Sequence, residues 1–233
     1  MGDIITVARK DIREILECKI TTIMFIVAGA FLGIYYPFGF LKVQIHALGE
    51  LQTALDTYAG FLFLGTALAL AWGLTTRPFM LEKAERTIET LLTTPLSLRA
   101  IWLGKTAAVF AISYPVVLAN GLTLILLLNH AAGGGGFAGP SPLGWLNLLV
   151  TAPMFTFTFI ALAGLAEMIL MHPRIGQFLA FGIFFVVYRA GLIWSPGPGL
   201  VGVIYCLTAV GLLFIMAFAA RFLSRERIVL SIG

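Results

Sequence analysis

The feature that most constrains this chain is a series of apolar runs, each about twenty residues long, because a run of this length spans a bilayer as a helix. The runs lack the alternating polar pattern of barrel strands, and helices are the other way to pair every backbone polar group in lipid. Hydrophobic residues make up 60% of the chain and charged residues 11%. The sequence therefore predicts an all-α integral membrane protein.

Segments with charge, glycine or proline separate the runs, and residues 1–233 are expected to form a single transmembrane domain. The six expected transmembrane helices cover about residues 20–41, 57–77, 106–128, 146–171, 177–194 and 200–221. An amphipathic helix over about residues 3–18 precedes them, with Ile5, Ala8, Ile12 and Ile15 spaced by three and four. Such a helix is expected to lie in the membrane interface as an elbow that leads into the first span.

The positions of Lys and Arg predict the orientation, because cytoplasmic loops carry an excess of both. Of the fifteen in the chain, all but Lys42 and Arg189 fall in the N-terminal segment, the connections after the second and fourth spans, and the C-terminal tail. Both termini are therefore expected in the cytoplasm, with the chain in the cell (inner, cytoplasmic) membrane. Anionic lipid of the inner leaflet accounts for the net charge of +4, so nucleic acid is not an expected partner.

One charged segment, EKAERTIETLLTTP at residues 82–95, interrupts the apolar pattern between the second and third spans. On a helix, Glu82, Glu85 and Glu89 share one face, and Thr94 followed by Pro95 predicts that one short helix ends and another begins there. The apolar stripe of this segment, extended to residue 102, consists of Ala84, Ile88, Leu91, Leu92, Pro95, Leu98 and Trp102. A solvated interfacial helix would explain this pattern. Three glutamates beside anionic lipid are unfavourable, however, which favours docking of a protein partner.

The segment resembles a signature of ABC-2 type transporter permeases, in which Thr, Leu or Ile, and Glu precede two leucines and a proline. The matching residues are Thr87, Ile88, Glu89, Leu91, Leu92 and Pro95, with Glu82, Lys83, Glu85 and Arg86 similar to the charged residues that come before the signature. Arg86 departs from the glycine common in the family. The resemblance implies that residues 82–95 form a coupling helix, which fits a groove on a separate ATP-binding-cassette ATPase subunit that holds ATP and Mg.

The resemblance also implies the function: a permease subunit of an ATP-driven exporter, in which two copies, identical or homologous, surround a central route. No cofactor is expected in this chain, and an apolar interior favours a lipophilic or amphipathic substrate. Two other functions stay open. An intramembrane lipid-modifying enzyme would need acids, histidines or metal ligands at one depth, and Glu167 alone is available. A scaffold or sensor would recruit an ATPase without transporting anything.

Several residues inside or beside the spans have alternative explanations. Gly104, Lys105 and Thr106 end like a phosphate-binding loop, but its first glycine is replaced, and Lys105 is expected to reach the inner surface. Glu167 and Arg189 are expected either to anchor their helices at the interface or to line a route. The three histidines are too far apart in the topology for a metal cluster, so no metal site is expected.

Small and hydroxyl-bearing residues give two further expectations. Gly29 and Gly33 form a GxxxG motif, which permits close helix packing either within the chain or at a dimer seam. Residues that could line a pathway are Asn120, Thr151, Thr156, Thr158 and Glu167. Kinks at Pro115 and Pro153 that neighbouring helices stabilise would explain this composition equally well.

Overall fold

The computed structural model describes residues 2–48, 51–75, 78–79, 82, 96–133, 137–169, 182, 198–219 and 221. Within these ranges every regular element is helical, and no strand occurs. Four helices are long and apolar enough to cross a membrane: Lys19–Val43, Leu51–Thr75, Leu98–Ala131 and Pro142–Met168. The prediction of an all-helical membrane protein is confirmed at this level.

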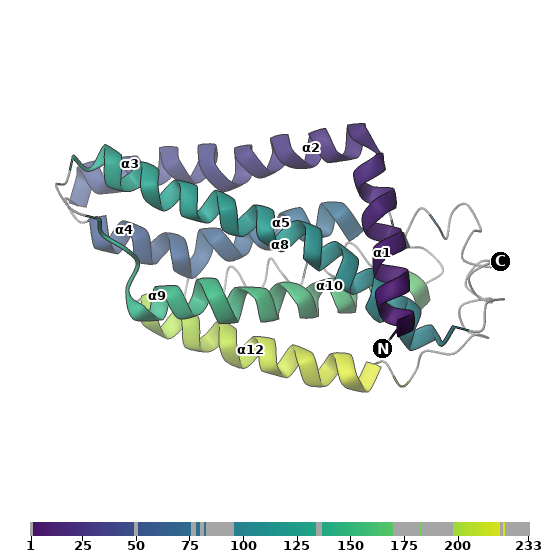
Figure 1. The fold of residues 1–233 in the computed structure, drawn as a ribbon. Coiled ribbons are helices and arrows are strands. Elements are labelled where there is room, and N and C mark those ends of the chain that lie inside the picture. The colour runs from purple at the N-terminus through teal and green to yellow at the C-terminus, as the bar shows by residue number, and fades with distance from the viewer. Residues whose placement is uncertain are drawn as a thin grey trace.

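The first two crossings are continuous helices, each with a π-helical turn inside it. The elements are α2 (Lys19–Ala30), η1 (Phe31–Tyr35) and α3 (Tyr36–Leu48), then α4 (Leu51–Thr57), η2 (Tyr58–Leu62) and α5 (Phe63–Thr75). They lie antiparallel along the bundle (Figure 1). Their long apolar sequences favour helices here, because in lipid a helix pairs its own backbone groups.

The next two crossings are α8 (Leu98–Ala131) and the continuous helix formed by α9 (Pro142–Leu146), η4 (Asn147–Thr151) and α10 (Ala152–Ile169). Ser97 caps α8, because its hydroxyl accepts a hydrogen bond of 3.2 Å from the backbone N–H of Ala100. The expectation that this helix begins at Thr94 and Pro95 is therefore corrected to Ser97, where a hydroxyl satisfies an orphan N–H group.

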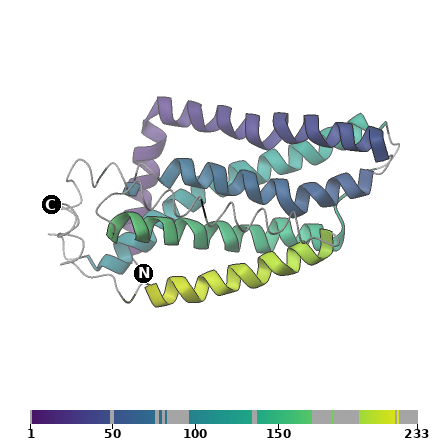
Figure 2. The same ribbon diagram turned by 180° about the vertical axis from the view of Figure 1, so that it is seen from behind.

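The last described helix is α12 (Pro198–Ala219), whose stretch Cys206–Phe218 is apolar. It begins beside α9 and runs in the same direction as α10 (Figures 1 and 2). Of the predicted fifth span, residues 177–194, only Gly182 lies within the described residues.

Helix α1 (Gly2–Glu17) lies across one end of the bundle, where it packs mainly on α8 (Figure 1). The predicted N-terminal helix is thus present, but its predicted apolar stripe is buried only in part: Ile15 is buried and Ala8 and Ile12 are half-buried, whereas Ile5 is 59% exposed. The fully buried face carries Val7, Asp11 and Ile15. The helix has more than one apolar strip, and the strip that contains a carboxylate is the one that is buried.

The core lies between α5, α8 and α10, where Phe63, Leu124 and Phe155 are almost fully buried. A second apolar cluster, Phe79, Trp102, Ala161, Leu165 and Met168, lies at the α1 end. Large apolar side chains are also exposed on the outer helices α2, α3 and α12, among them Met24, Phe40 and Phe214. Outward apolar faces of this kind are typical of helices that contact lipid.

Candidate functional site at the α1 end of the bundle

An ion-pair network joins α1, α8 and Glu82 at the α1 end. At its centre is Lys105, whose side chain is only 1% exposed. Its Nζ lies 2.7 Å from Glu82 Oε2 and 3.4 Å from Asp11 Oδ2. A buried ammonium is very unfavourable unless carboxylates compensate it, so these contacts explain how α8 tolerates Lys105. The expectation that Lys105 reaches out to the inner surface is wrong.

Glu82 is held from two helices at once. Its Oε2 contacts Lys105 of α8, and its Oε1 lies 3.5 Å from Nζ of Lys10 on α1. Lys10 also lies 3.3 Å from Glu14 Oε1, one turn along α1. We call Lys10, Asp11, Glu14, Glu82 and Lys105 the charge network. Glu82, the first residue of the predicted coupling segment, therefore contacts both α1 and the start of the third crossing.

The network shifts the pKa of two groups on α1. Burial raises the pKa of Asp11, and repulsion from Glu82 adds to this, although Lys105 and Lys10 oppose it. Burial disfavours the charged form of Lys10, but attraction to Glu82, Glu14 and Asp11 outweighs it and raises the Lys10 pKa. Burial therefore disfavours the charged form of Asp11, whereas the surrounding carboxylates favour the charged form of Lys10.

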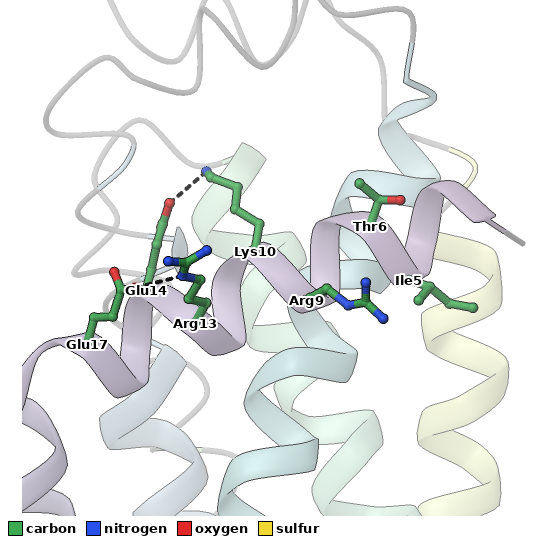
Figure 3. Close-up of a pocket in the computed structure, with 7 residues that line it drawn as sticks. All are labelled: Ile5, Thr6, Arg9, Lys10, Arg13, Glu14 and Glu17. Atoms are coloured by element: carbon green, nitrogen blue, oxygen red, sulfur yellow. Dashed lines mark hydrogen bonds and ion pairs between the residues drawn. The ribbon is translucent and has the colours of Figure 1, made fainter.

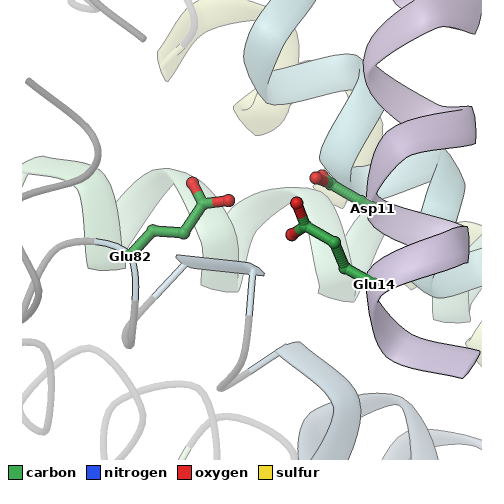
Figure 4. A group of neighbouring side chains, drawn as sticks. All are labelled: Asp11, Glu14 and Glu82. Atoms are coloured by element: carbon green, nitrogen blue, oxygen red, sulfur yellow. The ribbon is translucent and has the colours of Figure 1, made fainter. Parts of the chain in front are cut away.

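Three carboxylates of the network face one another (Figure 4). Oxygen atoms of Asp11, Glu14 and Glu82 lie within 4.8 Å of each other, a separation that a metal ion could bridge. The ammonium groups of Lys10 and Lys105, however, contact all three acids at 2.7 to 3.5 Å. These two lysines supply the positive charge that such a cluster needs, so the arrangement is explained as an ion-pair network.

A charged surface lies on α1 beside the network. A hollow of about 540 Å³ there is lined by Ile5, Thr6, Arg9, Lys10, Arg13, Glu14 and Glu17 (Figure 3). Arg13 Nε bonds Glu17 Oε1 at 2.7 Å, and both side chains are largely exposed. Thr6, Lys10 and Glu14 extend from one side of the helix, and Ile5 and Arg9 lie toward its other side. This surface presents both signs of charge next to Glu82.

The GxxxG motif packs inside the chain. A Cβ atom added at Gly33 would lie 2.9 Å from both Cβ and Nδ2 of Asn120 on α8, and one at Gly29 would lie 3.2 Å from Asn120 Nδ2. These contacts favour packing within the chain, because the missing side chains make room for α8, and a dimer seam at these glycines stays a prediction. Asn120, a pathway candidate, lies between α8 and the first crossing.

The remaining pathway candidates are all buried in η4 and α10. Thr151, Thr156 and Thr158 are at most 2% exposed, and Glu167 is fully buried. Glu167 therefore does not anchor α10 at the lipid headgroups, contrary to one of the two expectations. Thr158 donates a hydrogen bond to the carbonyl of Met154 one turn earlier. Arg189 lies outside the described residues.

Most of the predicted coupling segment is not described. Glu85, Arg86, Thr87, Ile88, Glu89, Leu91, Leu92 and Pro95 lie outside the described residues, and of the predicted coupling residues the structure places Glu82. Sequence reasoning missed Lys10, Asp11, Glu14 and Lys105 as its neighbours. The available signal was the spacing of Val7, Asp11 and Ile15, which puts a carboxylate on a buried face.

Comparisons with known proteins leave the family open. No family model, no curated protein and no solved structure matches this chain.

Proposed function

We propose that this chain is the membrane permease subunit of an ATP-driven ABC-2 type transporter, in which a separate ATP-binding-cassette subunit docks on residues 82–95. The observation that carries the proposal is the attachment of Glu82. The charge network joins this residue to α1 and to the start of α8. A partner that moved the segment after Glu82 would thus act on a membrane-crossing helix.

The order of the helices supports a six-helix topology. α10 ends at the α1 end of the bundle, while α12 begins at the opposite end and runs parallel to α10. A crossing between them, at the predicted span of residues 177–194, would produce this parallel arrangement. With that crossing, both termini lie on the side that carries most of the Lys and Arg residues, which is the cytoplasmic side.

The position of α1 supports the elbow assignment within this proposal. The helix lies across the end of the bundle where α5, α10 and α12 end and α8 begins, and its charged surface adjoins Glu82. The two copies of the permease, identical or homologous, would surround a route for export. A lipophilic or amphipathic substrate is proposed because the spans carry few fixed charges.

Charge reversal at Glu89 tests the proposal. Glu89→Lys is expected to leave the chain folded and inserted, because the predicted coupling helix lies outside the bilayer. Loss of the ATPase is expected, since a partly buried interface charge without its partner costs about 2 to 5 kcal/mol. The measurement is the amount of ATP-binding-cassette protein that copurifies with the tagged chain, together with ATP hydrolysis by the complex in nanodiscs.

Glu17→Lys is the matched control. Glu17 is an exposed acid on α1 whose pairing with Arg13 lies outside the charge network. This variant should retain the ATPase. Equal copurification from the wild type and Glu89→Lys would contradict the coupling assignment. If the wild type copurifies with an ATPase but ATP drives no transport across the membrane, the scaffold alternative holds. If no ATPase copurifies, the result favours the enzyme alternative.

A further inference from the structure

The connection that comes after α5 is attached to the bundle at two points three residues apart in sequence. The first is Phe79, which is 1% exposed and packs in the cluster with Trp102, Leu165 and Met168. Its ring fits against Gly164 of α10 so closely that an added Cβ there would lie 2.5 Å from the ring. The second point is Glu82, whose two carboxylate oxygens contact different helices.

Helix α1 is also fixed on α8 right beside the charge network. An added Cβ at Gly104 would lie 2.7 Å from Cβ of Val7 and 3.0 Å from the backbone oxygen of Ile4. The two helices are therefore close to backbone contact at Gly104. The next residue is Lys105, whose ammonium bonds Asp11 of α1 and Glu82.

Trp102 extends this packing to α10. Its ring is 2% exposed, and its Nε1 donates a hydrogen bond of 2.8 Å to the carbonyl of Ala161. One turn of α8, from Trp102 to Lys105, thus contacts α10, α1 and the chain after α5. This close packing and the buried ion pairs resist displacement of one element relative to the others. Displacement would separate the ammonium of Lys105 from its carboxylates where little water can replace them.

We propose that Lys105 is the positioning residue of a rigid joint, formed by Asp11, Glu82 and Lys105, that makes α1, the start of α8 and the chain at Glu82 move as one body. This inference rests on the proposed function for its purpose: an ATPase docked on residues 82–95 would transmit its movement through the joint into the third crossing. The joint itself, as a mechanical unit, does not depend on the ATPase. The two claims can therefore be tested separately.

The first experiment measures the rigidity of the joint without a partner. Nitroxide labels are placed on Thr6→Cys in α1 and Leu122→Cys in α8, after Cys18 and Cys206 are replaced by alanine. The distance distribution is then recorded by pulsed electron paramagnetic resonance in nanodiscs, with labelled chains diluted in unlabelled ones. A narrow distribution is expected for the wild type and for Lys105→Arg, which keeps the charge.

Two variants separate rigidity from folding. Lys105→Met leaves the buried carboxylate of Asp11 without its ammonium partner, although Glu82 keeps Lys10, and this variant is prone to misfold. The triple variant Lys105→Met, Asp11→Asn, Glu82→Gln removes all three charges together and should fold, but its distribution should broaden. Arg13→Gln with Glu17→Gln removes an exposed pair from the same helix and should leave the distribution narrow. A triple variant as narrow as the wild type would overturn the joint.

The second experiment tests transmission in the complex with the ATPase. Labels on Val43→Cys and Ala132→Cys, at the far end of the first and third crossings, report movement there on addition of ATP with vanadate. Because Glu82 is itself a predicted docking residue, this experiment uses the double variant Lys105→Met, Asp11→Asn, in which Glu82 is unchanged and keeps Lys10 as its partner. This variant should bind the ATPase and hydrolyse ATP but lose the shift in label distance, while the Arg13, Glu17 variant keeps it. A full shift in the double variant would overturn transmission. Absence of any ATPase from the wild type would refute the proposed function and transmission, with rigidity still decided by the first experiment.

Discussion

The GxxxG motif offers a prediction with a magnitude that the structure supplies. Gly29 and Gly33 lie one turn apart on the first crossing, and Asn120 of α8 fits against both. A new Cβ at Gly33 would lie 2.9 Å from Cβ and Nδ2 of Asn120. At Gly29 the nearest atoms are Asn120 Nδ2 at 3.2 Å and side-chain carbons of Val116 and Leu70 at 3.5 and 3.6 Å.

Carbon atoms in contact prefer a separation of about 3.5 to 4.0 Å, so Gly33→Ala must push the two helices apart or displace Asn120. Overpacking of this kind costs about 1 to 3 kcal/mol, and the better helix propensity of alanine returns about 0.5 to 1 kcal/mol. We therefore expect Gly33→Ala to lower the free energy of unfolding by about 1 to 2 kcal/mol. Gly29→Ala should cost less, because its one tight contact, at 3.2 Å, is with the end of the Asn120 side chain, and its other contacts are ordinary.

Combining each change with Asn120→Ala identifies the clashing atoms. Asn120→Ala removes Nδ2, which is the close contact at Gly29, but keeps the Cβ that lies 2.9 Å from the new methyl at Gly33. In the Asn120→Ala background, Gly29→Ala should therefore be fully tolerated and Gly33→Ala only partly rescued. The measurement is equilibrium unfolding in mixed detergent micelles, arranged as two double-mutant cycles.

The competing outcome concerns assembly. If Gly33→Ala left the unfolding free energy unchanged but weakened the self-association of the chain, measured by energy transfer between labelled copies, the two glycines would lie at a seam between chains. That result would refute the packing argument. Equal destabilisation by Gly29→Ala and Gly33→Ala would refute the argument from the distances.

Three further predictions concern orientation, titration and the connection after α8. A cysteine at Ala132 should react with an impermeant maleimide in intact cells and one at Ser97 only after permeabilisation; the reverse would overturn the orientation. Burial raises the pKa of Asp11 in the folded chain, so the folded state binds this proton more tightly than the unfolded state does. The free energy of unfolding of the wild type, compared with that of Asp11→Asn, should therefore fall as the pH rises from about 4, the Asp pKa in the unfolded chain, through the raised pKa. A pH-independent difference would contradict the burial of this group. Asn129→Ala removes the side-chain oxygen that accepts a hydrogen bond of 2.7 Å from the Ala138 N–H, and it should speed hydrogen exchange at that amide. Thr123→Ala is the control and should not, because the Thr123 hydroxyl donates to a carbonyl of its own helix.

The spans were the part of the fold that could be predicted from the sequence. In lipid every backbone N–H and C=O must be hydrogen-bonded, and each apolar segment meets this requirement by itself as a helix. Four of the six predicted spans coincide with helices long and apolar enough to cross a membrane. The helix bounds were less predictable. α8 begins at Leu98, eight residues before the predicted span at 106, since Ser97 caps it and its first turns include Arg99 and Lys105. Hydropathy identifies the apolar part of such a helix and not its extension beyond the bilayer.

The partner of Asp11 in the charge network could not be predicted from local pattern. On α1, the stripe of Ile5, Ala8, Ile12 and Ile15 is the one that periodicity favours because it is wholly apolar, whereas the buried face contains Asp11. Burying that carboxylate is tolerated because Lys105, which is 94 residues away in sequence, lies 3.4 Å from it. Periodicity carries no information about such a partner. The lysine was equally misleading, because a basic residue at the end of an apolar run ordinarily extends toward the headgroups.

The pathway candidates are separated by what their polar atoms contact. Thr158 donates to a carbonyl of its own helix, so helix structure explains it. Asn120 fills the groove at Gly29 and Gly33, but its buried Nδ2 has no hydrogen-bond partner among the described residues. The hydroxyls of Thr151 and Thr156 are buried and have no hydrogen-bond partner among the described residues. An unsatisfied buried hydroxyl costs about 1 to 3 kcal/mol, which packing alone does not explain. Under the proposed function, a polar substrate group or a water would supply the partner that these two hydroxyls lack among the described residues.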